Sequence, residues 1–294
     1  MTPPVHAFTV DLEDWYQGLE IGSERWGSYA PRLARGLGPL LDLLDEAGVR
    51  GTFFVLGFQA AQTPDLIRAV AARGHEIASH GYSHEFVYRQ TPAAFRDELR
   101  RSRALLEDLV GAPVIGFRAP FFSITAASTW AFDVLAEEGF VYDSSVFPVH
   151  NYRYGIPGAT RRPGPLRTPS GHFLFEIPLS TLRLPHREAR RGFNVPLSGG
   201  GYFRLYPYRL TRALVQRLIA GGEDLVFYVH PWEYDPDHPR VEMPRRVPRF
   251  THYHNLGSMA DKTRRLLRDF RFGPLGAIYG SRFHEKDTRC ASTF

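Results

Sequence analysis

Short apolar runs alternate with helix-like stretches over most of this chain of 294 residues, and this alternation limits the folds that it can adopt. The apolar runs are typical of buried strands and lie at 5–10, 51–57, 75–79, 114–117, 140–142 and 224–229. The helix-like stretches between them are 31–48, 63–73, 91–110, 125–139 and 207–221. Strands that alternate with helices favour parallel βαβ units with right-handed crossovers. We therefore expect an α/β fold built on a parallel sheet.

The regular alternation lapses in two places. Residues 144–206 are rich in Pro, Gly and Arg, and we interpret them as short antiparallel or irregular excursions over the top of the barrel. Residues 231–257 are predicted to be loop, and 258–271 a basic amphipathic helix. Neither region has the pattern of a separate domain.

Five side chains that could bind a metal, transfer a proton or pair with a carboxylate lie at equivalent places along the predicted strands. Each lies at the C-terminal end of a strand: Asp11, His80, Arg118, Asp143 and His230. In parallel α/β barrels the active site is built at the face where the strands end. The sequence therefore predicts that these side chains converge on one site.

Within this set, His80-Gly-Tyr-Ser-His84 has a spacing that suits a metal ion. In a helix, or in a tight turn, two histidines four positions apart can reach one ion. The acidic cluster that begins at Asp11 could supply a carboxylate ligand and also a base. Zinc is commonly held by His nitrogens plus a carboxylate, with a fourth position open in catalytic sites. Such a set can support metal-assisted hydrolysis of an amide or ester.

Each of these residues also has a plain structural explanation. The acidic turn could cap the next segment, and histidines beside a glycine turn could be buried or capping residues. Arg118 could end a surface strand, and His230 could pack on Trp232. The pair of histidines is a weak signal by itself, and its weight comes from the whole strand-end set.

Composition excludes several classes of protein. Apolar residues make up 43% and charged residues 23%, as in folded globular proteins. Because Cys290 is the one cysteine, no disulfide can form within the chain and any metal must be held by His, Asp or Glu.

The net charge of +5 does not indicate a nucleic-acid partner, because it is unevenly distributed. From Arg240 onward there are 12 basic and 5 acidic residues (+7), so the preceding residues sum to −2. No signal peptide is visible, and no apolar run reaches the roughly 18 residues of a membrane span. We expect a cytoplasmic protein that binds no nucleic acid and has no transmembrane segment; the pattern leaves its oligomeric state open.

Several ordered motifs resemble those of polysaccharide deacetylases of the NodB-homology superfamily, a carbohydrate esterase type. They are Gly51-Thr-Phe-Phe-Val-Leu-Gly57, Gly74-His-Glu-Ile-Ala-Ser-His-Gly-Tyr-Ser-His84, Phe117-Arg-Ala-Pro-Phe121, Gly139-Phe-Val-Tyr-Asp-Ser-Ser145 and Tyr228-Val-His-Pro-Trp-Glu233. Within the superfamily, three further segments are most similar to the group from exopolysaccharide loci associated with exosortase systems. These segments are Thr9-Val-Asp-Leu-Glu-Asp-Trp15, Ser198-Gly-Gly-Gly-Tyr-Phe203 and Leu267-Arg-Asp-Phe-Arg-Phe-Gly-Pro274.

The resemblance implies a deformed parallel (β/α) barrel with fewer than eight complete units. With it we expect a single catalytic domain over residues 1–294, in which 5–235 form the barrel core and 236–294 an extension packed on the barrel.

The resemblance also implies a divalent metal, most often zinc, with His80 and His84 as ligands. The other roles that it implies are Asp11 as the catalytic base, Arg118 as the residue that orients it, His230 as the catalytic acid, the backbone N–H of Phe121 as the oxyanion donor, and Asp143 as a support for the acid histidine.

The first motif departs from the family pattern, in which two aspartates are often adjacent. Here the order is Asp11-Leu-Glu13-Asp14. Strand alternation places Asp11 and Glu13 on the same face, which favours Glu13 as the third ligand. If the strand ends at Asp11, Asp14 could take that place instead.

Three functional hypotheses follow from the motifs. The leading one is removal of N-acetyl groups from amino sugars of a bacterial exopolysaccharide or its lipid-linked precursor, with an acetylated polysaccharide or oligosaccharide as substrate. The second is a metal-dependent amidase acting on a small or cyclic amide, and the third is a catalytically silent glycan-binding module. A groove lined by aromatic residues would favour sugar rings, and the candidates for its lining are Trp15, Tyr82, Phe122, Tyr202 and Trp232.

Overall fold

A mixed sheet whose neighbouring strands are mostly parallel forms the centre of the computed structural model, which describes residues 5–19, 21–184, 193–243 and 246–286. The strand order is β10-β1-β2-β3-β4-β5-β7-β6, and all neighbours are parallel except β6 and β7. The six strands expected from the apolar runs are all present: β1 Val5–Leu12, β2 Thr52–Val55, β3 Glu76–Ser79, β4 Gly116–Phe117, β5 Tyr142–Asp143 and β10 Val226–Val229. The α/β class and the parallel sheet predicted from the sequence are confirmed.

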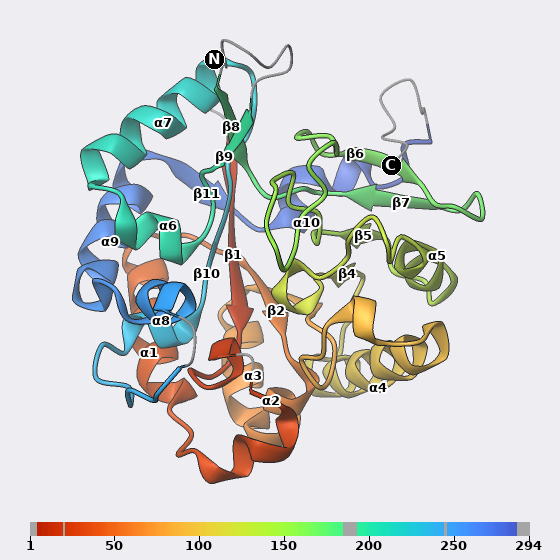
Figure 1. The fold of residues 1–294 in the computed structure, drawn as a ribbon, viewed down its shortest axis with the longest axis horizontal. Coiled ribbons are helices and arrows are strands. Elements are labelled where there is room, and N and C mark those ends of the chain that lie inside the picture. The colour runs from red at the N-terminus through yellow and green to blue at the C-terminus, as the bar shows by residue number, and fades with distance from the viewer. Residues whose placement is uncertain (1–4, 20, 185–192, 244–245, 287–294) are drawn as a thin grey trace.

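Helices flank this sheet in the intervals where helical periodicity predicts them (Figure 1). They are α1 Leu33–Glu46, α3 Pro64–Ala72, α4 Pro92–Val110, α5 Trp130–Glu137 and α7 Tyr208–Ala220, with α2 Gly57–Gln62 as an additional short helix. The start of α4 follows its sequence signal, because Oγ1 of Thr91 accepts a hydrogen bond from the backbone N–H of Ala94.

The irregular region after β5 contains two antiparallel strand pairs and a short helix. Its elements are β6 Gly164–Arg167, β7 Phe173–Glu176, β8 Thr181–Leu184, β9 Phe193–Pro196 and α6 Gly200–Leu205. The antiparallel pairs agree with the short excursions expected there. The parallel pairing of β7 with β5 was not expected, and it brings this region into the main sheet.

The C-terminal region differs more from the expectation. Residues 231–257, predicted to be loop, contain the helix α8 Arg246–Tyr253. The basic helix is α9 Met259–Asp269, and it is followed by the strand β11 Arg271–Gly273 and the helix α10 Leu275–Tyr279. Because β11 pairs with β1, its backbone hydrogen bonds go to the sheet, and a helical pattern gives no sign of such distant pairing. Cys290 lies outside the described residues.

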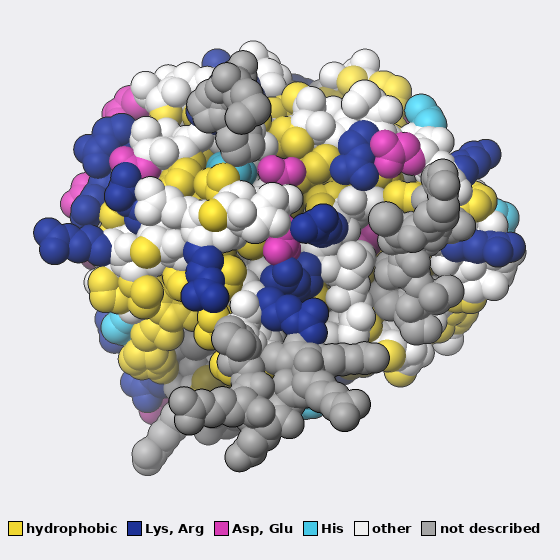
Figure 2. Space-filling model, turned by 90° about the horizontal axis from the view of Figure 1, so that it is seen from above, with side chains coloured by type: hydrophobic (Ala, Val, Ile, Leu, Met, Phe, Trp, Pro, Cys, Tyr) yellow, Lys and Arg dark blue, Asp and Glu magenta, His cyan; other side chains and the backbone are white. Residues whose placement is uncertain are grey.

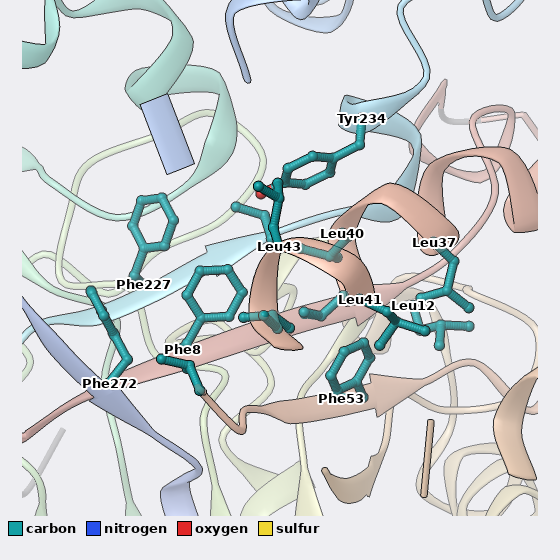
Figure 3. Packing of buried hydrophobic residues seen from close by; sticks show 14 of the residues in the cluster. Phe8, Leu12, Leu37, Leu40, Leu41, Leu43, Phe53, Phe227, Tyr234 and Phe272 are labelled. Carbon is teal, nitrogen blue, oxygen red and sulfur yellow. The ribbon is translucent and has the colours of Figure 1, made fainter. Parts of the chain in front are cut away.

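The main core lies between α1 and the strands β1, β2 and β10. Its side chains include Phe8, Leu12, Leu37, Leu40, Leu41, Leu43, Phe53, Phe227, Tyr234 and Phe272, all of which are buried (Figure 3). The leucines of α1 fall on one side of the helix, as their spacing predicts, so α1 is fixed against the sheet by apolar burial.

The surface does not carry a continuous basic stripe on the face that Figure 2 shows. There, Lys and Arg side chains are spread across the described part of the face with Asp and Glu side chains between them (Figure 2). Among the described residues, no helix combines the length and apolarity that crossing a membrane requires.

Gly36 and Gly38 of α1 offer a matched pair of variants for the packing of this helix. A Cβ at Gly36 would lie 2.0 Å from the backbone oxygen of Pro231, whereas one at Gly38 would meet nothing within 4 Å. We expect Gly36→Ala to lower the free energy of unfolding by about 1–3 kcal/mol, because the segment after β10 must move. Gly38→Ala should raise it by up to about 1 kcal/mol, because alanine favours the helix. Urea unfolding followed by circular dichroism measures both, and equal effects would contradict the close approach.

Candidate active site

The carboxyl ends of β1, β3, β4 and β10 meet around one cavity of about 260 Å³. Asp11, Glu13, His80, His84 and His230 all line this cavity. Parallel strands bring their C-terminal ends to the same edge, so residues that are far apart in the sequence become neighbours here. Of the five side chains predicted to converge at the strand ends, Asp11, His80 and His230 line this cavity, whereas Arg118 and Asp143 are fully buried and do not.

Glu13, His80 and His84 form a compact group of possible metal ligands. One ligand atom from each lies within 4.8 Å of the others, and all three residues are buried. Glu13 follows the end of β1, and His80 follows the end of β3. The segment between the two histidines is a tight turn and not a helix: Gly81 has φ 74° and His84 has φ 57°. The turn was one of the two geometries expected for this spacing.

His80 is held in the protonation state that a ligand needs. Its Nδ1 donates a hydrogen bond to the backbone oxygen of Arg118 at 2.8 Å. A carbonyl can only accept, so the proton sits on Nδ1 and the lone pair of Nε2 is left for another partner. Burial lowers the pKa of His80 to about 4, which keeps the ring neutral.

Glu13 is held as a carboxylate in this buried position. Burial alone would raise its pKa, but His84, and then His230 and His80, lower it to about 2. Its Oε2 lies 2.7 Å from Nε2 of His84. Two imidazole nitrogens and a carboxylate oxygen are donors that zinc prefers, and an ion shared by these atoms would balance the buried negative charge. The three residues therefore fit a divalent metal ion.

Asp14, the alternative third ligand, has a different role. Its Oδ2 accepts hydrogen bonds from the backbone N–H groups of Arg32 and Leu33 at 2.8 and 3.0 Å, and its Oδ1 accepts one from the N–H of Trp15. Arg32 and Leu33 begin α1, whose first N–H groups have no partner within the helix. Asp14 caps that helix from a distant loop, and the interpretation of Asp14 as a metal ligand is not supported.

Arg118 holds Asp11 through a fully buried ion pair. Its Nη1 donates to Oδ1 of Asp11 at 2.6 Å and to Oγ1 of Thr9 at 2.9 Å. On its other side, Nη2 and Nε donate to the hydroxyl and the backbone oxygen of Ser144. The other carboxylate oxygen of Asp11 lies 4.0 Å from Nε2 of His230. The carboxylate is thus fixed on one side and directed toward the cavity on the other.

His230 is oriented by Glu233, which sequence reasoning did not single out. Oε2 of Glu233 lies 3.3 Å from Nδ1 of His230 and accepts the backbone N–H of His230 at 2.9 Å. Burial opposes protonation of His230, but the hydrogen bond to Glu233 and the charges of Glu13 and Asp11 raise its pKa to about 9. Arg204 of α6 completes the arrangement with two contacts of 3.0 Å to Oε1 of Glu233. The three-residue spacing in His-Pro-Trp-Glu was the available signal for Glu233.

Asp143 does not support His230 in this structure, so that expectation is corrected. Its carboxylate accepts hydrogen bonds from the N–H and the hydroxyl of Ser145, whose hydroxyl in turn accepts the N–H of Ala119. Burial raises the pKa of Asp143, and burial together with Asp143 raises the pKa of Glu176 well above its usual range. Asp143 thus fixes the turn after Arg118 while Glu233 occupies the place beside the histidine.

The turn after Arg118 has unusual backbone angles at the wall of the cavity. Phe121 and Phe122 have φ values of 55° and 53°, which non-glycine residues rarely adopt. Both residues line the cavity, and the ring of Phe121 lies 4.4 Å from the ring of His84. This backbone geometry is typical of functional sites, where the surrounding structure enforces it.

Three of the five aromatic residues predicted to line a groove do so: Phe122, Tyr202 and Trp232. The prediction is wrong for Trp15 and Tyr82. Trp15 is buried behind the cavity wall, in the cluster that also contains Trp232, and donates its indole N–H to the backbone oxygen of Ala30. The guanidinium carbon of Arg101 lies over the ring of Tyr82, 3.5 Å from the ring centre. The sequence pattern missed several lining residues from the irregular regions, among them Tyr152, Tyr154, Leu205, Val247 and Phe250.

Two family models match the chain. Residues 34–137 match the model described as polysaccharide deacetylase, and residues 144–279 match a domain of unknown function, DUF3473. The first match contains His80, His84 and Arg118, and the second contains His230. The site is therefore assembled from both matched segments and from β1, which precedes them.

Two curated relatives named as deacetylases are similar to part of this chain. A chitooligosaccharide deacetylase from Bradyrhizobium sp. is 40% identical over 98 residues, which are 33% of this chain and 42% of that protein. A peptidoglycan deacetylase-like protein from Gibberella zeae is 35% identical over 122 residues, 41% of this chain and 35% of that protein. The matched residues span less than half of these relatives.

The crystal structure of a Mycobacterium smegmatis protein named as a polysaccharide deacetylase has a TM-score of 0.58 at 21% identity, covers 96% of this chain and 94% of that one, and shows the same fold. Residues 34–137 are thus similar to polysaccharide deacetylases, and the shared fold extends over nearly the whole chain.

Glu13 and Asp14 can be distinguished as metal ligands by matched amide substitutions. We expect Glu13→Gln to weaken zinc binding at least about tenfold, because it removes a ligand charge that the two histidines cannot replace. Asp14→Asn should leave zinc affinity unchanged and lower the free energy of unfolding by about 1 kcal/mol, because it weakens the cap of α1. Competition titration with a chromogenic chelator measures affinity. Weakened binding in Asp14→Asn alone would contradict the assignment.

Proposed function

We propose that this relative of the polysaccharide deacetylases is a metal-dependent hydrolase that removes N-acetyl groups from amino sugars of a bacterial exopolysaccharide or its precursor. One observation carries the proposal: a single cavity brings together Glu13, His80 and His84, His230, and Asp11, which the buried Arg118 holds from behind. Amide hydrolysis needs a site for an activated water, a base and an acid, and this cavity contains a candidate for each.

Glu13, His80 and His84 would hold a divalent metal, which would supply polarisation of the acetyl carbonyl and a lowered pKa for the attacking water. Asp11 acts as the general base. Its Oδ1 is fixed by Arg118 at 2.6 Å, which leaves Oδ2 to accept the proton of the water.

His230 acts as the general acid for the amine that leaves. Glu233 lies at Nδ1, so Nε2 is directed toward the cavity, where it lies 3.3 Å from Glu13 and 4.0 Å from Asp11. From this position it delivers a proton to the sugar nitrogen as the C–N bond breaks, and acetate and the free amine are released. The backbone N–H of Phe121 is the proposed donor to the oxyanion.

The lining of the cavity supports a carbohydrate substrate. Tyr202 is partly exposed and provides an aromatic ring against which a sugar can pack, while Phe122 and Trp232 contribute buried aromatic surface to the wall. The curated relatives are named for chitooligosaccharide and peptidoglycan deacetylation, which places acetylated amino sugars first among the candidates.

The exopolysaccharide assignment rests on the resemblance of three segments to the exosortase-associated group. Two of these segments, 198–203 and 267–274, lie inside the 144–279 region that matches the domain of unknown function. We propose this group, with zinc as the metal, because the resemblance and the donor set both favour them.

Acetate release tests the proposal. We expect zinc-dependent release of acetate from N-acetylated chitooligosaccharides or from acetylated bacterial exopolysaccharides. Asp11→Asn should lower kcat by about 10²–10⁴-fold, because it removes the base while the shape of the side chain is kept. Asp42→Asn, which changes an exposed carboxylate of α1, is the matched control and should keep full activity.

Failure to release acetate from every acetylated glycan, with one zinc ion bound per chain, would refute the sugar substrate. Turnover of small cyclic amides under the same conditions would then favour the amidase, and glycan binding without turnover of either class would favour the silent binding module.

A further inference from the structure

Exposed hydrophobic side chains gather at the rim of the catalytic cavity. Four of the eight large hydrophobic residues that are exposed in the described part of the chain also line this cavity. Their exposed fractions are 70% for Val247, 65% for Tyr152, 52% for Phe250 and 48% for Leu205. Exposed apolar residues that cluster beside a functional site usually mark a binding surface. We call these four residues the apolar rim.

The rim is held in place by the same contacts that orient the acid histidine. Val247 and Phe250 are three residues apart on α8, so they project from one side of it, while His252 and Tyr253 are buried. Arg204 donates hydrogen bonds to the backbone oxygens of residues 251, 252 and 254, and the same guanidinium pairs with Glu233. The rim residues on α8 and α6 are thus fixed relative to His230, and Figure 1 shows α8 next to α6.

The side chains of the rim suit a hydrocarbon better than a further sugar. Sugar rings are usually bound by flat aromatic faces together with hydrogen-bonding groups, whereas Val247 and Leu205 provide only aliphatic surface. An alkyl chain gains free energy from contact with any apolar side chain, in proportion to the area removed from water. Because the rim is continuous with the cavity that contains the metal-ligand candidates, a substrate could occupy both at once.

We propose that the apolar rim binds the hydrocarbon chain of a lipid-carried substrate while its N-acetylated sugar occupies the catalytic cavity. This inference rests on the proposed function and narrows its substrate class to glycolipids. The lipid portion is not altered by the reaction. By binding at the rim, it orients the sugar in the cavity.

N-Acetyl-β-glucosaminides with methyl, butyl and octyl aglycones, used below their micelle concentrations, test the proposal. We expect kcat/KM for acetate release to rise at least about tenfold from methyl to octyl, because burial of about two methylene groups gives this factor. In the double variant Val247→Ser/Phe250→Ser, the ratio of octyl to methyl kcat/KM should fall toward one. Leu210→Ser is the matched control: this leucine of α7 is 45% exposed but does not line the cavity, so its ratio should stay as in the wild type.

Two further measurements separate this inference from the proposed function. Octyl glucoside carries no acetyl group, so calorimetric titration reports binding to the rim without turnover, and the double variant should weaken that binding at least about fivefold. Acetate release with equal kcat/KM for all three aglycones would overturn the inference and leave the proposed function standing. No release from any glycoside, with octyl glucoside still bound at the rim, would overturn the proposed function alone.

Two rival occupants of the rim give different results. In the first case, kcat/KM for chitooligosaccharides rises with each added sugar, this gain is lost in the double variant, and the alkyl chain has no effect. The rim then binds sugars, and the proposal is wrong. If the wild type but not the double variant sediments with phospholipid vesicles and the aglycone has no effect on kcat/KM, the rim binds a bilayer surface and the proposal is equally wrong.

Discussion

The buried guanidinium of Arg118 is the interaction on which the rest of the site depends. It is fully removed from water, and its charge is balanced by Asp11 and by hydrogen bonds to Thr9 and Ser144. Its plane lies over the ring of Phe54 at 4.0 Å. A buried cation without such partners would be costly, so these contacts determine how the ends of β1, β2 and β5 are arranged. The backbone oxygen of the same residue fixes the tautomer of His80. One residue thereby orients both the candidate base and a candidate ligand.

A second buried arginine does for the acid what Arg118 does for the base. Arg204 balances the charge of Glu233, and Glu233 holds His230. Because Arg204 also binds three backbone oxygens around the end of α8, the segment that forms the cavity rim and the residue that delivers the proton share one anchor. Breaking either ion pair would leave an uncompensated charge in the interior, which is more harmful than losing a surface pair.

The sequence predicted the site best where a residue's place follows from local geometry. Asp11, His80, Arg118 and His230 lie where parallel strands end, and strand alternation favoured Glu13 over Asp14. Partners that depend on distant segments were out of reach of such reasoning. Asp14 caps a helix that begins 19 residues later, and Arg204 reaches Glu233 from another helix. Trp15 and Tyr82 were placed in the groove because composition does not tell a buried aromatic residue from one at a cavity wall. The sequence did not predict the strand β11 or the helix α8, because tertiary contacts fix these elements more strongly than any local sequence pattern indicates them.

The pairing of β1 with both β10 and β11 has a consequence for the order of folding. Ala7 is in register with Val226 and with Gly273, so the first half of β1 receives both neighbours from the far end of the chain, while its second half, which contains Asp11, also pairs with β2. During synthesis, the edge of β1 that pairs with β10 stays uncovered for more than 200 residues. Such distant pairings slow folding, because a long loop must close before any contact compensates for the lost entropy. The chain can therefore pair β1 with β2 and add β3–β5 early, whereas β10, which carries His230 at its end, joins the sheet only after residues 226–229 have been made, so the candidate acid is the last part of the site to be put in place.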